Sequence, residues 1–154
     1  ANPTDRCHII VSDNKIFEES PLFESNIIRI YKSKEEQIQR IYNELIYAKK
    51  MFEISNVALF GAGGHSHKLA EANVPLDNWV SVVLDNDPNK QGTNFQPINV
   101  PILSPSEIKF NKIDYIIISS RADQRQMVEQ VREINSESKI VTLYPEVQIH
   151  EYQV

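Results

Sequence analysis

Short apolar segments alternate with helical segments along the second two-thirds of the chain, and this alternation constrains the fold more than any other feature of the sequence. Strand-like runs, rich in valine, isoleucine and leucine, occur at 56–60, 79–85, 99–103, 114–120 and 139–144. Helical patterns lie between them at 64–73 and 123–134, and Ser104 to Ile108 has the spacing of a capped helical turn. Strands that alternate with helices in this way are typical of a doubly wound parallel sheet. We therefore predict an α/β, Rossmann-like domain with about five parallel strands over residues 56–154.

A different pattern precedes this region, and we predict that residues 1–55 form an N-terminal extension. Short β-branched runs at 7–12 and 26–31 suggest strands, and residues 33–52 predict a long amphipathic helix that opens with a capping box. The apolar residues of that helix recur at helical spacing: Ile38, Ile41, Tyr42, Leu45, Ala48, Met51 and Phe52. Because the opposite face is polar, one side of the helix must pack against something. We expect the domain boundary near residues 53–56.

Composition narrows the class of protein. The 154 residues include 41% hydrophobic residues, which suffices for one ordinary domain with a full core. The net charge is -5 and no basic stripe is present, so we expect neither nucleic-acid binding nor attraction to an anionic membrane surface. No apolar run reaches the roughly 18 to 20 residues that span a bilayer, and no signal-peptide pattern opens the sequence. We expect a cytoplasmic protein, and the start at Ala1 rather than methionine agrees with a segment of a longer polypeptide.

Three of the four glycines in the chain, Gly61, Gly63 and Gly64, fall between the first predicted strand and the helix that follows it. In a doubly wound sheet this turn faces the crevice where ligands bind. Glycine at the first position permits a positive φ, and the lack of side chains at the next two lets a ligand approach the backbone. The dinucleotide fingerprint GxGxxG is only partly matched, because Ser66 replaces its third glycine. The turn is either an anion-binding or nucleotide-binding site or a turn that lets strand and helix pack closely.

Asp85 supplies the second element of that fingerprint, an acid at the end of the second strand that holds a ribose hydroxyl. It lies 24 positions after Gly61 and is followed by Asn86, and we predict that both contact a ligand. The segment from Asp85 to Gly92 is also rich in turn formers, so an ordinary turn is the alternative.

Two histidines, His65 and His67, open the predicted helix. Residues two apart on a helix do not face each other, and no cysteine or third histidine lies nearby, so we predict no metal site. A histidine at a helix start can instead donate a hydrogen bond to a phosphate or a sugar, and we predict this role for His65, with packing as the alternative. Lys68 is one turn further on and is expected to be solvated.

The residues after the fourth strand, Ser119, Ser120 and Arg121, form the other wall of the predicted crevice. The hydroxyl groups can bind a ligand, although Ser120 or Asp123 can equally cap the next helix. Arg121 can bind a phosphate with two hydrogen bonds. The chain contains no GxSxG elbow, P-loop or HExxH motif, so we predict no catalytic residue.

The runs "VALFGAGGHSHKLAE", "VVLDNDPNKQG", "VPILSPSEI" and "DYIIISS" together resemble Rossmann-like domains of bacterial surface-polysaccharide and deoxysugar biosynthesis. The turn from Asp85 to Gly92 and the run from Pro101 to Ile108 resemble the C-terminal domain of sugar C-methyltransferases. GAGGH followed by Lys68 resembles the N-terminal domain of sugar-nucleotide acetyltransferases, and the nucleotide-binding part of nucleotide-sugar dehydratases is a third relative.

The resemblance implies a domain that positions a nucleotide-linked sugar, while other domains of a longer polypeptide perform the chemistry. That polypeptide would be a SAM-dependent methyltransferase or a glycosyltransferase. Residues 56–144 carry it, and no SAM-binding domain, hexapeptide repeat or dehydratase motif is present in the sequence. One alternative is an NAD(P)-binding domain of a small oxidoreductase. Another is an interaction module that forms a homodimer through the helix at 33–52.

Overall fold

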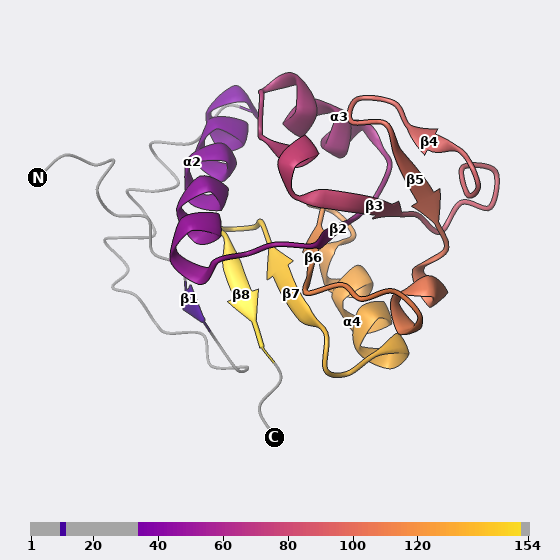
Figure 1. The fold of residues 1–154 in the computed structure, drawn as a ribbon. Coiled ribbons are helices and arrows are strands. Elements are labelled where there is room, and N and C mark those ends of the chain that lie inside the picture. Colours follow the sequence, from indigo (N-terminus) through magenta and orange to yellow (C-terminus); the bar gives the residue numbers. More distant parts are fainter. Residues whose placement is uncertain (1–9, 12–33, 152–154) are drawn as a thin grey trace, which may run out of the picture.

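The computed structural model describes residues 10–11 and 34–151, which form three layers with a sheet in the middle (Figure 1). Helices α2 and α3 lie on one side of the sheet, and α4 lies on the other with the short 3-10 helix η3. The helices are α2 (Lys34–Phe52), α3 (Gly64–Glu71), η2 (Leu76–Asn78), η3 (Pro105–Lys109) and α4 (Gln124–Ile134). The strands are β1 (Ile10–Val11), β2 (Val57–Phe60), β3 (Val80–Leu84), β4 (Asn94–Phe95), β5 (Val100–Leu103), β6 (Tyr115–Ile118), β7 (Lys139–Thr142) and β8 (Gln148–His150).

The strand order is β1-β8-β7-β6-β2-β3-β5-β4. Strands β3, β2, β6 and β7 run parallel to one another, as does β5 along β3. The chain moves outward from β2 in one direction through β3 and β5, and then in the other direction from β6 through β7. The order therefore reverses between β2 and β6, which is where Rossmann-like sheets bind ligands.

The predicted fold class is confirmed, because all five expected strands and the three expected helical elements after residue 55 are present within two residues or so of their predicted ends. Ser104 caps η3 by accepting a hydrogen bond from the Ser106 amide. Two strands were not expected: β4 pairs antiparallel with β5, and β8 pairs antiparallel with β7. The strand predicted at 26–31 lies outside the described residues, as does most of the one at 7–12, of which β1 is the described part.

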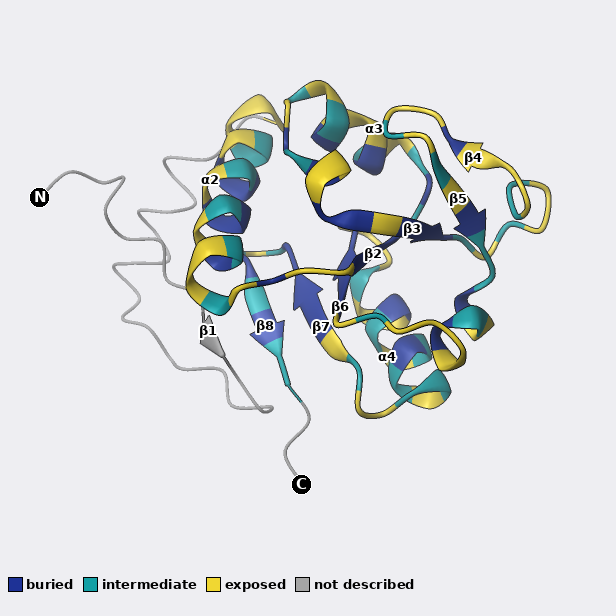
Figure 2. Ribbon diagram, in the orientation of Figure 1, coloured by how far each residue is buried: buried dark blue, intermediate teal, exposed yellow. Residues whose placement is uncertain are grey.

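Alternate residues of the central strands pack into two separate cores. Figure 2 shows that these strands are mostly buried. In β2, Val57 and Leu59 pack on the α2 and α3 side, whereas Ala58 and Phe60 pack on the α4 side. Every residue of β2 is buried, which explains why the strand reads as a continuous apolar run instead of an alternating one.

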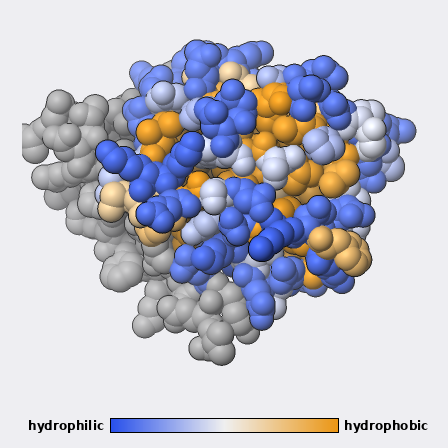
Figure 3. Space-filling view, in the orientation of Figure 1, coloured by the Kyte–Doolittle hydropathy of each residue, from blue (hydrophilic) through white to orange (hydrophobic). Residues whose placement is uncertain are grey.

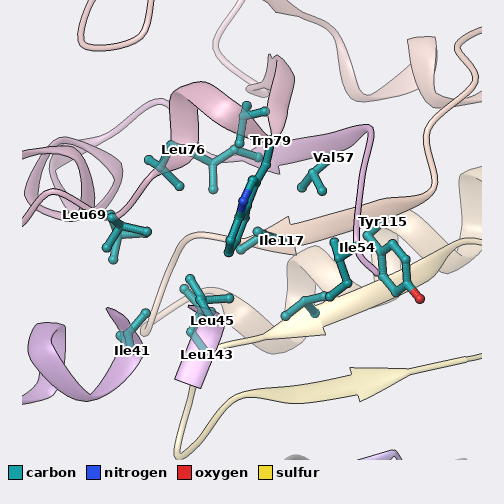
Figure 4. Packing of buried hydrophobic residues seen from close by; sticks show 14 of the residues in the cluster. Ile41, Leu45, Ile54, Val57, Leu69, Leu76, Trp79, Tyr115, Ile117 and Leu143 are labelled. Atoms are coloured by element: carbon teal, nitrogen blue, oxygen red, sulfur yellow. The ribbon is translucent and has the colours of Figure 1, made fainter. Parts of the chain in front are cut away.

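The predicted long helix is confirmed as α2, and its apolar face joins the core on the α3 side of the sheet. Figure 4 shows Leu45 of α2 facing Trp79 and Ile117, so the helix and the sheet share one set of packed side chains.

The same helix carries a buried ion pair, with Arg40 Nη1 2.7 Å from Glu44 Oε2. Arg40 also donates to the Leu143 carbonyl oxygen and Glu44 accepts from the Val147 amide, which ties the helix to the segment between β7 and β8. The domain boundary near residues 53–56 stays a prediction.

On the face shown in Figure 3, hydrophilic residues cover most of the described periphery, and hydrophobic residues show between them near the middle. Within the described part of the chain, no helix is both long enough and apolar enough to cross a membrane.

Candidate functional site

The glycine turn connects β2 to α3 at the point where the strand order reverses. Gly61 follows the last residue of β2 and has a φ of +116°, a backbone conformation that residues with an L side chain rarely adopt. A Cβ placed on Gly61 would lie 3.0 Å from the carbonyl oxygen of Ser119 in the neighbouring strand connection. The turn therefore requires glycine at this position both for its dihedral angle and for the close approach of the chain that follows β6.

Gly63 and Gly64 have a different role, because a Cβ placed on either would meet nothing within 4 Å. Gly63 has extended backbone and sits at the N-cap of α3, where no side chain caps the helix. The first amides of an α-helix have no acceptor within the helix, and they carry its partial positive charge. The two glycines thus leave open space in front of hydrogen-bond donors.

A cavity of about 410 Å³ opens beside this turn. Eight of the ten residues that the sequence predicted as ligand contacts line it: Gly61, Gly63, Gly64, His65, Asp85, Asn86, Ser119 and Ser120. Five further residues complete the wall: Phe60, Asp123, Gln126, Met127 and Gln130. The geometry therefore brings the glycine turn, the end of β3 and the end of β6 together around one space.

Ser66 and Arg121 do not line the cavity. Ser66 is fully buried, and its hydroxyl group donates to the carbonyl oxygen of Gly61 and lies 2.7 Å from Ser119 Oγ. A small side chain is needed here because α3 packs closely against the strand ends, the same requirement that glycine meets in the full fingerprint. Arg121 instead donates to Gln37 of α2, and its guanidinium carbon lies 5.5 Å from the centre of the Tyr144 ring.

Asp85 lines the cavity, but both of its carboxylate oxygens already accept hydrogen bonds from the protein. Oδ2 accepts from the Ala62 amide at 2.8 Å, and Oδ1 accepts from the Asp87 amide at 2.8 Å. Lys90 Nζ lies 3.3 Å from Oδ2. Burial would raise the pKa of the Asp85 carboxyl, but the two amide hydrogen bonds and the Lys90 ammonium group hold that pKa below its usual value. Asp85 therefore stays ionised and ties the loop after β3 to the glycine turn.

His65 lies at the start of α3 with both ring nitrogens engaged. Nδ1 is 2.9 Å from Ser119 Oγ, and Nε2 is 2.6 Å from the Tyr144 hydroxyl oxygen. Burial, and secondarily the charge of Lys68, lowers the pKa of His65 to about 4, so the imidazole is neutral at pH 7. The structure thus places His65 as part of a hydrogen-bonded network of protein groups rather than as a free donor to a ligand.

Side chains from opposite walls meet across the cavity. Asn86 Nδ2 donates to Gln130 Oε1 at 3.0 Å, and Gln130 Nε2 donates to Asn86 Oδ1 at 2.7 Å. Asp123 is the N-cap residue of α4, but its side chain makes no cap hydrogen bond; Ser120 Oγ accepts from the Asp123 amide instead.

Sequence reasoning missed the five further wall residues named above and also Tyr144. Gln130 and Met127 carry a detectable signal, because both lie on the α4 face that the predicted topology turns toward the crevice. Tyr144 carries no such signal, since its contact with His65 joins residues 79 positions apart.

The two histidines at the start of α3 contact different neighbours. The ring of His67 packs on Phe95, with centroids 4.9 Å apart, while His65 turns toward Tyr144. Among the described residues, no group of three or more histidine, cysteine, aspartate or glutamate side chains could hold a metal ion.

Donors and acceptors lie on different parts of the cavity wall. The α3 amides offer donors on one side, and the Asp85 carboxylate offers acceptors at the end of β3. No lysine or arginine is among the described residues that line the cavity. An anionic group would thus rest on helix amides, and groups with hydroxyl donors would suit the strand ends.

A family model described as C2185-like, N-terminal, matches residues 53–141. The chain belongs to this family. The match spans 89 positions and includes the glycine turn, Asp85 and the segment from Ser119 to Arg121. All ten predicted ligand contacts therefore fall inside the family match. A search of curated proteins found no match.

Solved structures similar to this C2185-like chain share little sequence with it. UDP-D-quinovosamine 4-dehydrogenase from Vibrio fischeri is 18% identical with a TM-score of 0.46, and the match covers 65% of this chain and 94% of that one. RSP in complex with beta-NADH is 16% identical with a TM-score of 0.47, covering 71% of this chain and 62% of that one. RSP, a Rex-family repressor, gives the same identity and TM-score and covers 71% and 61%. With TM-scores below 0.5, these likenesses carry no argument about function.

Proposed function

We propose that the cavity binds the nucleoside diphosphate part of a nucleotide-linked sugar, and that the domain positions this ligand for a transferase whose catalytic groups lie outside these residues. One observation carries the proposal: the N-terminus of α3, which no side chain caps, opens at Gly63 and Gly64 onto the cavity. This cavity lies where the strand order of the sheet reverses. Helix N-termini of this kind favour phosphate groups.

The remaining features support a nucleotide rather than a small anion. The cavity of about 410 Å³ lies near the lower end of the range for small-molecule sites, about 300–1,000 Å³, and so suits one nucleotide better than a dinucleotide. Phe60 and Met127 give the wall an apolar part against which a base can pack, and Asp85 offers an acceptor for a hydroxyl group. The sequence resemblance to polysaccharide and deoxysugar biosynthesis favours a methyltransferase or glycosyltransferase context.

Isothermal calorimetry with UDP-sugars and dTDP-sugars tests the proposal. We expect saturable binding in the micromolar to low-millimolar range, and we expect Gly63→Val to weaken it at least tenfold because the branched side chain enters the open space. Gly63 has extended backbone that valine adopts readily, so the variant should fold normally. Ser136→Ala, on an exposed turn that does not line the cavity, is the control and should bind like the wild type.

Two results would overturn the proposal. One is the absence of any heat with every nucleotide and nucleotide-sugar at millimolar concentration. The other is a specific enhancement of NADH fluorescence without binding of UDP or dTDP compounds, which would favour the NAD(P)-binding alternative.

A further inference from the structure

The side-chain amides of Asn86 and Gln130 form a reciprocal pair between two walls of the cavity, called the amide pair below. Asn86 follows β3 and Gln130 lies on α4, and both line the cavity. Each side chain donates to the other, at 3.0 Å and 2.7 Å. An amide group has two N–H donors and an oxygen with two lone pairs, so the pair uses only half of the hydrogen-bonding capacity of each side chain.

The backbone at Asn86 is anchored on both sides, whereas the amide pair itself can open. Gln91 Nε2 donates to the Asp85 carbonyl oxygen at 2.9 Å, and the Asp87 amide donates to Asp85 Oδ1 at 2.8 Å. The side chain of Asn86 is exposed and that of Gln130 is half-buried. Water therefore replaces the hydrogen bonds of the pair when it opens, and opening costs little free energy.

Apolar side chains lie on the same part of the wall as the amide pair. Met127 precedes Gln130 by three positions on α4, so both side chains lie on one face of the helix. Met127 and Phe60 are buried residues of the same core, and both line the cavity. An apolar surface beside a few polar groups suits a flat ring that packs with its face and forms hydrogen bonds with its edge.

The edge of a uracil or thymine ring has the hydrogen-bonding pattern that the amide pair can receive. This edge carries one N–H group, at N3, between two carbonyl groups, and its O=C–N–H unit matches the unit that each side chain presents to the other. When the pair opens, the two base carbonyl oxygens accept from the NH₂ groups of Asn86 and Gln130. The base N–H then donates to one of the two side-chain oxygens, so three hydrogen bonds replace two.

Resting on the proposed function above, we propose that Asn86 and Gln130 are specificity-determining residues that exchange their mutual hydrogen bonds for the edge of a uracil or thymine base. The diphosphate then rests on the α3 amides, and the base lies toward α4 with one face on the apolar part of the wall. A ligand without such an edge leaves the amide pair closed.

Replacing Gln130 with methionine removes one side of the amide pair and keeps the length of the side chain. Methionine is also a good helix former, so α4 should stay intact. In calorimetric titrations with UDP, we expect Gln130→Met to bind about 3- to 10-fold more weakly than the wild type, the range for loss of one hydrogen bond. Gln39→Met is the matched control, because Gln39 also bonds to an asparagine, Asn43, on an exposed helix face and does not line the cavity. It should bind UDP like the wild type.

UDP that is methylated at N3 tests which part of the ligand meets the amide pair. The methyl group removes the only N–H donor of the base edge and leaves the ribose and the diphosphate unchanged. The wild type should bind this analogue about 3- to 10-fold more weakly than UDP. The double variant Asn86→Ala with Gln130→Met should bind the two ligands equally, because neither amide remains to distinguish them.

Side-chain NH₂ signals in nitrogen-15 NMR spectra report the amide pair separately from the phosphate site. Addition of UDP should shift the NH₂ signals of Asn86 and Gln130 together with the backbone amides at the start of α3. Shifts of the α3 amides without any change in these NH₂ signals would overturn base recognition by the pair and leave the proposed nucleotide site standing. Failure of the wild type to bind UDP at all would overturn both.

Two binding results would also overturn the role of the amide pair. Tighter binding of UDP by Gln130→Met would show that the pair only blocks the cavity. Equal binding of UDP and its N3-methyl analogue by the wild type would show that the base edge does not face these side chains. In both cases UDP still binds, so the proposed function survives the loss of this inference.

Discussion

Replacing Gly61 with alanine should destabilise the fold, while the same change two and three residues later should not. Gly61 has a φ of +116°, which an alanine adopts at a cost of about 1–3 kcal/mol. Its new Cβ would lie 3.0 Å from the Ser119 carbonyl oxygen, a backbone atom that must move for the methyl group to fit. Adding about 1 kcal/mol for that displacement, we expect Gly61→Ala to lose about 2–4 kcal/mol of unfolding free energy.

Urea unfolding monitored by tryptophan fluorescence measures this loss directly. The chain has one tryptophan, Trp79, which is 4% exposed and packs in the core on the α2 side, so its emission reports global unfolding. For a domain of this size, each kcal/mol shifts the Tm by about 2–4 °C, so thermal unfolding should move by about 4–16 °C.

Gly63→Ala and Gly64→Ala are the matched controls, because their added methyl groups meet no atom within 4 Å. Gly64 is the first residue of α3, and alanine there should be neutral or stabilising by up to about 1 kcal/mol. A Gly61→Ala protein within about 0.5 kcal/mol of the wild type would refute the reasoning about this turn, as would an equal loss in all three variants.

Three other changes should have measurable effects. The pKa of His65 is lowered from its ordinary value of 6.5 to about 4 in the folded protein, so the unfolded chain binds a proton more readily than the folded one. The free energy of unfolding should therefore fall by about 1–2 kcal/mol as the pH drops from 6.5 to 4. Denaturant titrations across that range measure this fall, which should be smaller in His65→Asn. Arg40→Met should cost about 3–5 kcal/mol in urea unfolding, because it leaves the Glu44 carboxylate buried without its partner, and a loss below 1 kcal/mol would contradict this. Asp85→Asn should lower the free energy of unfolding by about 1–3 kcal/mol, because the backbone amide of Ala62 or of Asp87 then faces an NH₂ group instead of an oxygen. Unchanged stability would show that Asp85 does not tie the two loops together.

The fold could be predicted because the signals for it are local. The strand from Val57 to Phe60 is a continuous apolar run, which is how a strand buried on both faces reads, and the helix at Lys34–Phe52 has a clear apolar face. Strand β4, Asn94–Phe95, has two residues and lies in a turn-rich segment, so it has no periodicity to detect. Strand β8 has three residues, of which only Ile149 is buried, and its pairing with β7 depends on tertiary contacts.

The composition of the site could be predicted further than its hydrogen bonds. The ends of adjacent parallel strands meet at one edge of the sheet, so Gly61, Asp85 and Ser119 had to lie close together once the topology was known. The partners of these residues could not be predicted, because they depend on side-chain directions. Arg121 turned toward α2, and Tyr144 reached His65 from the end of a strand that the motif does not include.

The backbone amides of α3 test the central claim most directly. In nitrogen-15 correlation spectra recorded during a titration with UDP-glucose, we predict the largest shifts at Gly64, His65 and Ser66, smaller shifts at Asn86 and Ser120, and none around Lys139, at the opposite end of β7. Saturable shifts confined to this set would place the diphosphate on the helix N-terminus. Unchanged amides at millimolar ligand, or shifts centred on another surface, would contradict the claim that this cavity is a nucleotide site.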